Sequence, residues 1–597
     1  MSEVKDITKS INGLFSNFSN RRKFQFIFIL FLNLLSGYSE FLIVGSVGLF
    51  ITSITQPEIL YKSNLFDKFI NIIGMNQIND ARLIILILFI SIILFSSIIR
   101  LLNLWINMKF RVAYFKDLSK KAFAKVLYQD YEYHIQNNSS ELISDLTINM
   151  EMTNGFIDQF LVIFMYVFSA ISIISAILFI NFKLTLLIIS IIGFTYILLT
   201  TFINRKISKY GKYVVESNNI LFRTLQEGLG SIKDVILENN QIFHTDKFES
   251  YVGRARKYEA IVSLLSQSPK FFIEGLGLII IALIGFSISS TSESNNAITF
   301  LGSFALGAQK LLPAIQNIYS SWTNLISYNK GFEKILILLC LPALNKGKNI
   351  GTKNPNKVKF NNRIIFKNIY YKYPNTENFS LKNINLEIKK GEKIGIIGKT
   401  GSGKSTFINL LMGLLEPYSG NLIIDKKDLF NSKERSNLFD WRNSIGHVPQ
   451  KIFLADTTIL ENIAFAEDRL NIKLKEVEEA ADKACIKDYI ISTKNKFYTI
   501  VGEQGINMSG GQLQRIGIAR ALYKRKEVLI FDEATSALDN ETETKLIRKV
   551  NSLTKGITIF IVAHRLSTLK NCDRILEFKN GKISRIFPSN ELKTNIG

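Results

Sequence analysis

The chain is 597 residues long, 47% of them hydrophobic, and carries a formal net charge of +23. This length exceeds one ordinary domain, and uninterrupted apolar runs of about 20 residues or more exclude a purely soluble protein. A charge of this size would favour nucleic acid as the partner of a soluble protein. Here the basic residues collect on alternating sides of the apolar runs, so we expect no nucleic-acid partner. The three cysteines, Cys340, Cys485 and Cys572, indicate no disulfide framework.

Six apolar runs in the first half of the chain are each long enough to cross a hydrocarbon core of about 30 Å. They predict an all-α transmembrane domain of six helices over residues 1–335. The runs lie near residues 24–51, 83–106, 156–180, 184–203, 271–289 and 298–326. Lysine and arginine precede the first run and follow the second and the fourth, whereas the loop at 291–296 has none. The positive-inside rule therefore places both termini in the cytoplasm.

Two segments outside the apolar runs have amphipathic patterns. Residues 1–23 predict a helix on the cytoplasmic surface, and a frayed tail is the alternative. Residues 64–74 predict a short helix on the outer leaflet, and an ordinary external loop is the alternative.

Four charged residues fall within or beside the apolar runs: Glu40, Arg100, Glu274 and Lys310. A charge at membrane depth costs several kcal/mol unless it finds water or a partner. We therefore treat the four as candidates for a substrate cavity, in which phosphate oxygens would accept hydrogen bonds from the cations. The alternatives are that Lys310 pairs with Glu274 on the neighbouring helix and that Arg100 extends to the membrane interface.

In the second half, a glycine-rich loop lies between a β-like run at 393–397 and a helical pattern at 407–412. This strand, loop and helix context predicts a phosphate-binding P-loop. Its glycines let backbone N–H groups point at phosphates, while Lys404 adds a positive charge and Ser405 offers a hydroxyl to Mg²⁺. The loop residues that we expect to bind nucleotide are Gly398, Thr400, Gly401, Ser402, Gly403, Lys404, Ser405 and Thr406.

Downstream, Met508 is followed by Ser509, Gly510, Gly511 and Gln512, and the apolar run 528–531 ends in Asp532 and Glu533. At these residues the chain resembles the ATP-binding cassette (ABC) ATPases. The resemblance covers the expected elements in order, namely Tyr373, the P-loop, Gln450, the stretch 502–505, residues 508–512, Asp532 with Glu533, the stretch 536–539 and His564. The departure is Met508 where the family usually has leucine, an apolar exchange of similar volume.

This resemblance implies a multi-domain chain in which a linker, 336–357, connects the helical domain to an α/β P-loop ATPase domain, 358–597. It implies ATP and Mg²⁺ as cofactors, with Ser405, Gln450 and Asp532 at the metal. Glu533 would orient or deprotonate the attacking water, and His564 would contact the γ-phosphate. Tyr373 would stack on adenine, although Tyr370 and Tyr371 leave that choice open. Ser509, Gly510, Gly511 and Gln512 would complete the nucleotide site of a second copy, so the resemblance implies a homodimer.

Similarity to ABC exporters also implies two cytoplasmic coupling helices, near residues 139–144 and 221–234. Polar residues at 268–274 and 309–313, together with Glu40, resemble the branch that flips lipid-linked oligosaccharides. The resemblance thus implies a multi-pass protein of the bacterial cytoplasmic (inner) membrane that contacts membrane lipid and moves an amphipathic substrate, a polyprenyl-pyrophosphate glycan. A peptide or multidrug exporter is the alternative. The six runs disfavour a soluble ABC ATPase acting on DNA or ribosomes, and the fused domains disfavour an importer.

Overall fold

The computed structural model describes residues 2–55, 78–180, 182–289, 294–342, 360–374, 376–431, 436–502, 505–524, 526–534, 539–553, 556–563 and 565–593. The chain divides into two compact units. The helical unit comprises residues 1–129 and 137–342, and the α/β unit comprises residues 130–136 and 343–597.

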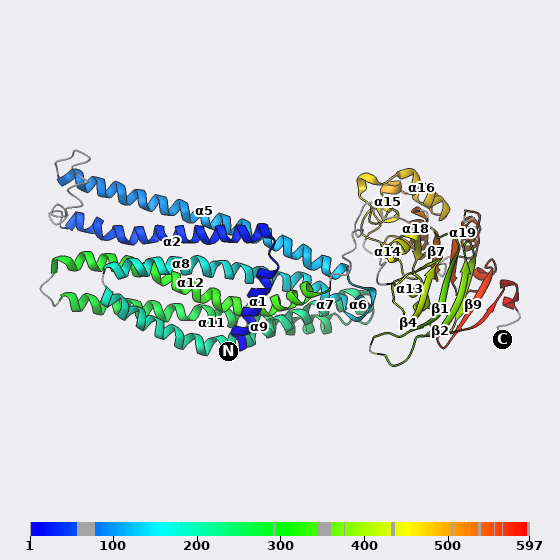
Figure 1. Ribbon diagram of the computed structural model, residues 1–597, viewed down its shortest axis with the longest axis horizontal. Coiled ribbons are helices and arrows are strands. Elements are labelled where there is room, and N and C mark those ends of the chain that lie inside the picture. The colour runs from blue at the N-terminus through cyan, green and yellow to red at the C-terminus, as the bar shows by residue number, and fades with distance from the viewer. Residues whose placement is uncertain are drawn as a thin grey trace. The chain divides into compact units, whose positions relative to one another are not determined.

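Long helices running side by side make up the helical unit (Figure 1). They are α2 (Asn20–Thr55), α5 (Ile78–Leu127), α8 (Met150–Ile180), α9 (Phe182–Gly230), α11 (Gln241–Ser289) and α12 (Ser294–Cys340). Each contains one of the six apolar runs. Within the described residues, three segments are long and apolar enough to cross a membrane: Asn20–Thr55, Arg82–Leu127 and Ser139–Ile180. The bent pair Thr185–Leu198 and Ile203–Gly230 makes a fourth if it counts as one span. The number six therefore stays a prediction.

The amphipathic lead-in forms helix α1 (Ser2–Ser16) and is not a frayed tail. Its Ile7 and Leu14 are buried among aromatic side chains of the helical unit. The Tyr114 hydroxyl donates a hydrogen bond to the Leu14 carbonyl oxygen at 3.2 Å. The apolar face of α1 is thus covered by protein.

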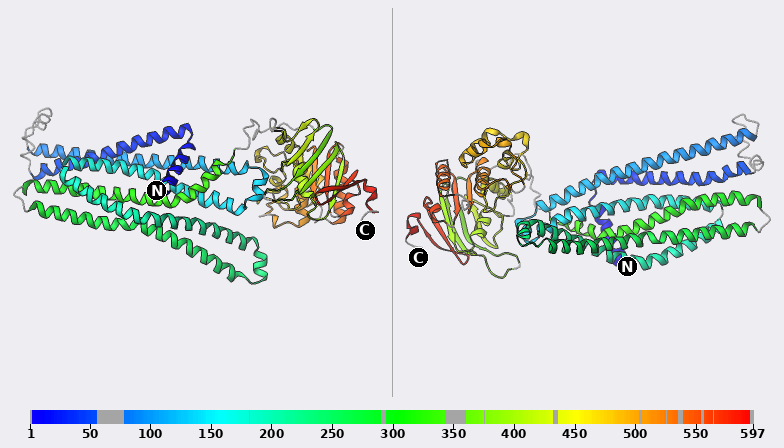
Figure 2. Two further views of the ribbon diagram at one scale, coloured as in Figure 1. Left: turned by 60° about the horizontal axis from the view of Figure 1, so that its bottom comes forward. Right: turned by 180° about the vertical axis from the view of Figure 1, so that it is seen from behind.

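Helices α9 and α11 are joined by the short helix α10 (Ile232–Leu237) and form a hairpin. The tip of this hairpin stands apart from the other helices of the unit in the left view of Figure 2. Apolar side chains at the tip are exposed, with Leu237 at 79% and Ile242 at 73%. The region predicted to hold the second coupling helix, 221–234, therefore overlaps an apolar tip that the helical unit itself leaves uncovered.

The segment predicted as the first coupling helix is continuous with the helix of the third apolar run. Residues 139–144 form helix α7 (Ser139–Ser144), which continues through the π-helix η1 (Asp145–Asn149) into α8. The Asn138 side chain begins α7 by accepting a hydrogen bond from the Ser140 N–H at 3.0 Å, so α7 belongs to the same rod as the third apolar run. The segment that groups with the α/β unit is instead α6 (Tyr131–Gln136). The coupling role of residues 139–144 stays a prediction, and α6 is a second candidate for it because it groups with the α/β unit.

Two sheets form the α/β unit. The larger has the order β10-β9-β3-β8-β7-β6, and its strands are parallel except for β10. The smaller is antiparallel, with the order β2-β1-β4-β5. The strands are β1 (Arg363–Tyr371), β2 (Leu381–Lys389), β3 (Lys393–Gly398), β4 (Ser419–Ile424), β5 (Lys427–Asp428), β6 (Ile445–Val448), β7 (Val528–Asp532), β8 (Thr558–Val562), β9 (Arg574–Lys579) and β10 (Lys582–Phe587).

Strands β3, β7 and β8 lie inside the larger sheet and are nearly continuous apolar runs, as expected for parallel strands covered on both faces. The α-helices of this unit that follow α6 are α13 (Lys404–Leu411), α14 (Ser436–Ser444), α15 (Ile459–Ile463), α16 (Leu474–Lys483), α17 (Lys487–Ser492), α18 (Gly510–Tyr523), α19 (Asn540–Leu553) and α20 (Leu566–Leu569). Short 3-10 turns occur at Arg469–Asn471, Lys496–Tyr498 and Ser589–Lys593. Parallel strands end at one edge of a sheet, so the segments after β3, β6 and β7 are brought close together.

Candidate functional site

The loop between β3 and α13 has a backbone that requires glycine. Gly398 has φ +149°, and a Cβ there would lie 2.4 Å from the carbonyl oxygen of Phe578. Gly403 has φ +107° and caps the N-terminus of α13. These positions curl the chain tightly in front of the helix, which directs free backbone N–H groups into the loop.

The Lys404 side chain is folded into this loop. It is 8% exposed, and its Nζ donates hydrogen bonds to the carbonyl oxygens of Gly398 at 2.7 Å and Lys399 at 3.1 Å. Ser405 is exposed beside it, whereas the Ser402 hydroxyl is buried and has no partner among the described residues. The loop therefore holds an ammonium group and unpaired donors in the place where a phosphate would lie.

The segments after β6 and β7 bring Gln450 and Glu533 together. The Gln450 Nε2 donates a hydrogen bond to Glu533 Oε2 at 2.6 Å. The Glu533 N–H donates to the Val562 carbonyl oxygen at 3.0 Å, and Glu533 adopts φ +52°, a conformation that non-glycine residues rarely take. The carboxylate is thus oriented both by its backbone and by the neighbouring amide.

The ionised form of Asp532, at the end of β7, is disfavoured by its surroundings. Burial raises the pKa of Asp532 and the adjacent Glu533 raises it further, while Lys404 lowers it. The hydroxyl of Ser405, the carboxylate of Asp532 and the amide oxygen of Gln450 are the oxygen ligands that Mg²⁺ prefers. The negative charges of Asp532 and Glu533 are only partly compensated by Lys404, so a divalent cation fits this site.

The three tyrosines before the P-loop have different surroundings. The Tyr371 ring is 1% exposed and its hydroxyl donates to Glu132 Oε1 of α6 at 2.7 Å; burial and this carboxylate raise the pKa of Tyr371. Tyr370 packs edge-on against Phe379. Tyr373 is partly buried, and its hydroxyl lies 3.2 Å from the Thr406 hydroxyl in α13. These contacts favour Tyr373 for stacking on adenine.

Sequence reasoning missed the contact between α6 and the nucleotide region. The Tyr371 and Tyr373 rings meet edge to face, with centroids 5.1 Å apart. Glu132 of α6 therefore contacts Tyr371, and Tyr371 in turn contacts Tyr373, the candidate for stacking on adenine. No motif includes Glu132. The sequence signal that could have found it is the pair of acids, Asp130 and Glu132, that follows the long helix α5.

The residues of the 508–512 motif form the start of α18. Ser509 is its N-cap: the Ser509 Oγ accepts a hydrogen bond from the Gln512 N–H, and Gln512 Oε1 accepts one from the Ser509 N–H at 2.9 Å. Ser509 and Gly510 are exposed, and Met508 packs against the core beneath them. The N-terminus of α18 and its partial positive charge therefore face outward. Several other predicted features lie outside the described residues: His564, residues 503–504, residues 536–538 and the external segment 64–74.

His447 in β6 is half-buried and lies two positions before the loop that carries Gln450. Its Nε2 has no partner among the described residues, and burial lowers the pKa of His447 to about 4. An unfolded histidine has a pKa of about 6.5 and binds the proton first as the pH falls. The contribution of neutral His447 to the free energy of unfolding is therefore complete above pH ~6.5, and it is lost as the pH falls toward 4.

We expect the stability of the α/β unit to decrease between these pH values by at most about 1.4 kcal/mol per pH unit from this group. The check is the unfolding midpoint of the full chain against pH, for wild type and His447→Leu. The variant should show a shallower pH dependence. Equal slopes for both proteins would contradict a His447 that stays neutral in the folded chain.

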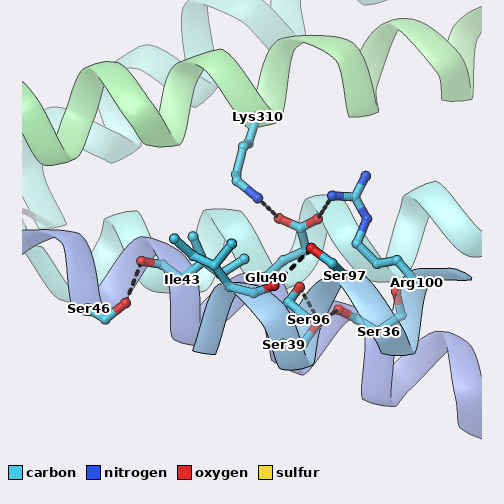
Figure 3. Close-up of polar contacts among 10 residues, drawn as sticks. Ser36, Ser39, Glu40, Ile43, Ser46, Ser96, Ser97, Arg100 and Lys310 are labelled. Carbon is cyan, nitrogen blue, oxygen red and sulfur yellow. Dashed lines mark hydrogen bonds and ion pairs between the residues drawn. The ribbon is translucent and has the colours of Figure 1, made fainter. Parts of the chain in front are cut away.

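In the helical unit, three of the four candidate charges form one cluster (Figure 3). Glu40 of α2 is only 5% exposed, and its carboxylate contacts Arg100 of α5 at 3.1 Å and Lys310 of α12 at 2.6 Å. Lys310 thus pairs with Glu40 and not with Glu274, and Arg100 is bound to the same carboxylate. The alternative of a Lys310 to Glu274 pair is wrong, because α2 presents the nearer acid. One carboxylate faces two cations, which leaves a formal charge of +1.

The fourth candidate, Glu274, lines a separate cavity of about 1110 Å³ between α8, α9, α11 and α12. Glu40, Arg100 and Lys310 are not among its lining residues. The four residues predicted as one substrate cavity therefore belong to two places, an ion cluster and a cavity.

Comparisons with known proteins agree with this geometry. Residues 41–308 match the family described as ABC transporter transmembrane region, and residues 381–536 match the family described as ABC transporter. The solved structure of a bacterial Atm1-family ABC exporter with ATP bound shares the fold, with a TM-score of 0.75 and 20% identity over 97% of each chain.

Curated relatives include two lipid A-core flippases and a protein translocator. The ATP-dependent lipid A-core flippase of Blochmanniella floridana is 36% identical over 59% of each chain. That of Wigglesworthia glossinidia brevipalpis is 32% identical over 65% of this chain and 66% of its own length. The chain thus spans less than two thirds of these flippases. The alpha-hemolysin translocation ATP-binding protein HlyB of Escherichia coli O157:H7 is 30% identical over 91% of this chain and 74% of its own. With its membrane-spanning helices and its P-loop ATPase fold in one polypeptide, this multi-pass membrane protein belongs to the ABC transporter family.

Proposed function

We propose that two copies of this chain hydrolyse ATP to move an anionic amphipathic lipid, of the polyprenyl-pyrophosphate glycan class, across the bacterial inner membrane. The observation that carries the lipid assignment is the cluster of Glu40, Arg100 and Lys310. Both termini and the α/β unit lie in the cytoplasm, where ATP is available and where the basic segments of the chain collect.

The ion cluster supports an anionic substrate through its excess positive charge. Glu40 and Arg100 fall within candidate membrane spans, and Lys310 lies in the predicted sixth run. One carboxylate compensates one of the two cations, and uncompensated charge at membrane depth is costly. The Arg100 side chain is 56% exposed and contacts Glu40 through Nη1. A guanidinium has five N–H donors, so other donors of Arg100 do not contact Glu40. A pyrophosphate group would accept hydrogen bonds from this fork and compensate the excess charge.

The site after β3, β6 and β7 has the parts needed for phosphoryl transfer to water, in which positioning and electrostatics supply most of the acceleration. Lys404 and the backbone of the P-loop hold the phosphates. Glu533 orients the water and accepts its proton, and Gln450 fixes the Glu533 carboxylate through the 2.6 Å hydrogen bond. Ser405, Asp532 and Gln450 would hold Mg²⁺, which neutralises phosphate charge. His564 is assigned to the γ-phosphate by the family resemblance.

Two exposed features support a homodimer. The N-terminus of α18 is open at Ser509 and Gly510, and an open helix N-terminus favours binding of an anion. The α10 tip exposes Leu237 and Ile242, and a cluster of exposed apolar side chains marks a surface that docks on another protein. A second copy supplies a partner for both.

The homodimer predicts complementation between two inactive chains. Lys404→Ala removes the phosphate-binding ammonium, and Ser509→Arg blocks the start of α18; each homodimer should hydrolyse ATP at least ~10²-fold more slowly than wild type. A co-expressed heterodimer, purified through two different tags, has one composite site with both groups intact and should recover up to half of the wild-type rate. A heterodimer as inactive as its parents would contradict nucleotide sites shared between copies.

The lipid assignment is tested by ATP hydrolysis in liposomes with and without a polyprenyl-pyrophosphate oligosaccharide. Wild type should be stimulated by this lipid, and Lys310→Ala should lose the response. In this variant Arg100 still pairs with Glu40, so the fold is retained and the excess positive charge is removed. If the lipid has no effect on wild type while peptides or hydrophobic drugs stimulate hydrolysis, the substrate assignment is wrong.

A peptide exporter is the second candidate, because the relative that aligns over 91% of this chain is named for alpha-hemolysin translocation. A membrane region without excess charge would suit such a substrate better. The cation excess at Glu40 favours the anionic lipid.

A further inference from the structure

The cavity between α8, α9, α11 and α12 has an apolar lining that is interspersed with many groups that both donate and accept hydrogen bonds. Its lining includes five amide side chains, four serines and three tyrosines. The amides are Gln267, Gln309, Gln316, Asn317 and Asn324. On α12 these positions recur at helical spacing, so they share one face of the helix. Paired donors and acceptors match hydroxyl groups, which also do both.

The charges at this cavity are balanced. Glu259 is paired at 2.5 Å with Arg256, which lies one turn earlier in α11 and outside the cavity lining. Lys270 and Glu274 contribute one charge of each sign. A neutral lining offers no compensation to a pyrophosphate or to an organic cation, whereas it accommodates an uncharged polar group.

Two prolines expose main-chain acceptors at the same place. Pro269 in α11 and Pro313 in α12 lack the N–H that would bind the carbonyl four residues earlier. The freed carbonyl of Leu265 is met by the Tyr319 hydroxyl at the long distance of 3.5 Å. The other freed carbonyl belongs to Gln309, whose side chain also lines the cavity.

Tyr196 adds a group without a partner. Its hydroxyl is buried beside the Tyr319 ring, 5.6 Å between ring centroids, and has no hydrogen-bond partner among the described residues. A buried hydroxyl without a partner is costly, and a ligand hydroxyl that reaches it removes this cost.

We infer that this cavity is a binding site for an uncharged, hydroxyl-rich group, namely a sugar of the lipid substrate. The inference rests on the proposed function and divides recognition between two places. The sugar is bound by the amides and hydroxyls of the cavity, and the phosphate is bound at the cluster of Glu40, Arg100 and Lys310. Removing cavity amides should then affect lipids that carry sugar and spare lipids that do not.

The test measures dissociation constants of tritium-labelled ligands for the full chain in nanodiscs. The ligands are a polyprenyl pyrophosphate carrying one N-acetylhexosamine, the same lipid without sugar, and a lipophilic quaternary amine. The variants are Gln309→Leu combined with Gln316→Leu, and the control Gln241→Leu, an exposed glutamine at the start of α11 that does not line the cavity. Thermal unfolding shows that each variant is folded.

The double variant should weaken binding of the glycosylated lipid about tenfold, as expected for the loss of one or two hydrogen bonds, and binding of the sugar-free lipid less than about twofold. Because the readout is a ratio between two lipids, a general loss of structure does not mimic it. Gln241→Leu should leave the ratio unchanged.

Three results would overturn the inference. If wild type binds the glycosylated lipid and the double variant binds it equally well, the sugar site is wrong and the proposed function stands. If wild type binds neither lipid, the proposed function itself fails. If the quaternary amine binds and the double variant loses it, the cavity is a cation site.

Discussion

Replacing Glu533 with glutamine should lower the rate of ATP hydrolysis by about two to three orders of magnitude and leave ATP binding intact. General-base catalysis by a positioned side chain contributes about 10²–10⁴ in rate, and glutamine keeps the size of the side chain while removing its basicity. The φ of +52° at this position is equally strained for both residues, so the fold should not change. Steady-state hydrolysis and nucleotide binding by the purified protein are the measurements.

The matched control is Glu527→Gln. Glu527 lies just before β7, where its side chain pairs with Lys390 at 3.2 Å. A partly exposed pair contributes little, so this variant should keep its hydrolysis within about twofold of wild type. If Glu533→Gln hydrolysed ATP as fast as Glu527→Gln, Glu533 would not be the base.

Removal of the Glu40 carboxylate should destabilise the helical unit by about 1–3 kcal/mol, because two partly exposed cations lose the carboxylate that compensates them. Here one deletion leaves two cations, Arg100 and Lys310, facing each other across α5 and α12. The measurement is the thermal unfolding midpoint of Glu40→Ala in lipid nanodiscs. We expect a clear decrease relative to wild type.

A second variant separates charge from packing. Glu40→Gln combined with Lys310→Gln removes one acid and one cation, so the formal charge of the cluster stays +1 and the amides can bond to each other. This protein should recover much of the stability that Glu40→Ala loses. Equal destabilisation by both variants would show that the space filled by Glu40 matters and its charge does not.

The nucleotide region was predictable because its motifs fix local geometry. Gly398, with its φ of +149°, and Lys404, six residues later, appear as a recognisable pattern in the sequence. The order of the strands brings the ends of β3 and β7 to the same edge of the sheet. The same holds for Ser509 and Gln512, since a capping box is a relation between residues three apart.

The helical unit was predictable in its elements and less so in its contacts. Apolar runs give helices, but the side-chain period of one helix does not say which residue of a distant helix lies opposite. The sequence offered Glu274, on the neighbouring helix, as the partner of Lys310, and it did not show that Glu40 of α2 lies nearer. The choice between 139–144 and α6 as the first coupling helix has a similar difficulty, because both segments are short and polar and lie between long helices.

The most direct test of ATP-driven lipid flipping is the movement of the lipid itself. A fluorescent polyprenyl-pyrophosphate oligosaccharide is placed in both leaflets of liposomes that contain the protein, and a membrane-impermeant glycosidase reports the fraction of glycan on the outside after ATP is added. Wild type oriented with the α/β unit outward should decrease that fraction with time, and Glu533→Gln should not. An outside fraction that stays constant with wild type and ATP, in a preparation that hydrolyses ATP, would contradict a glycolipid flippase.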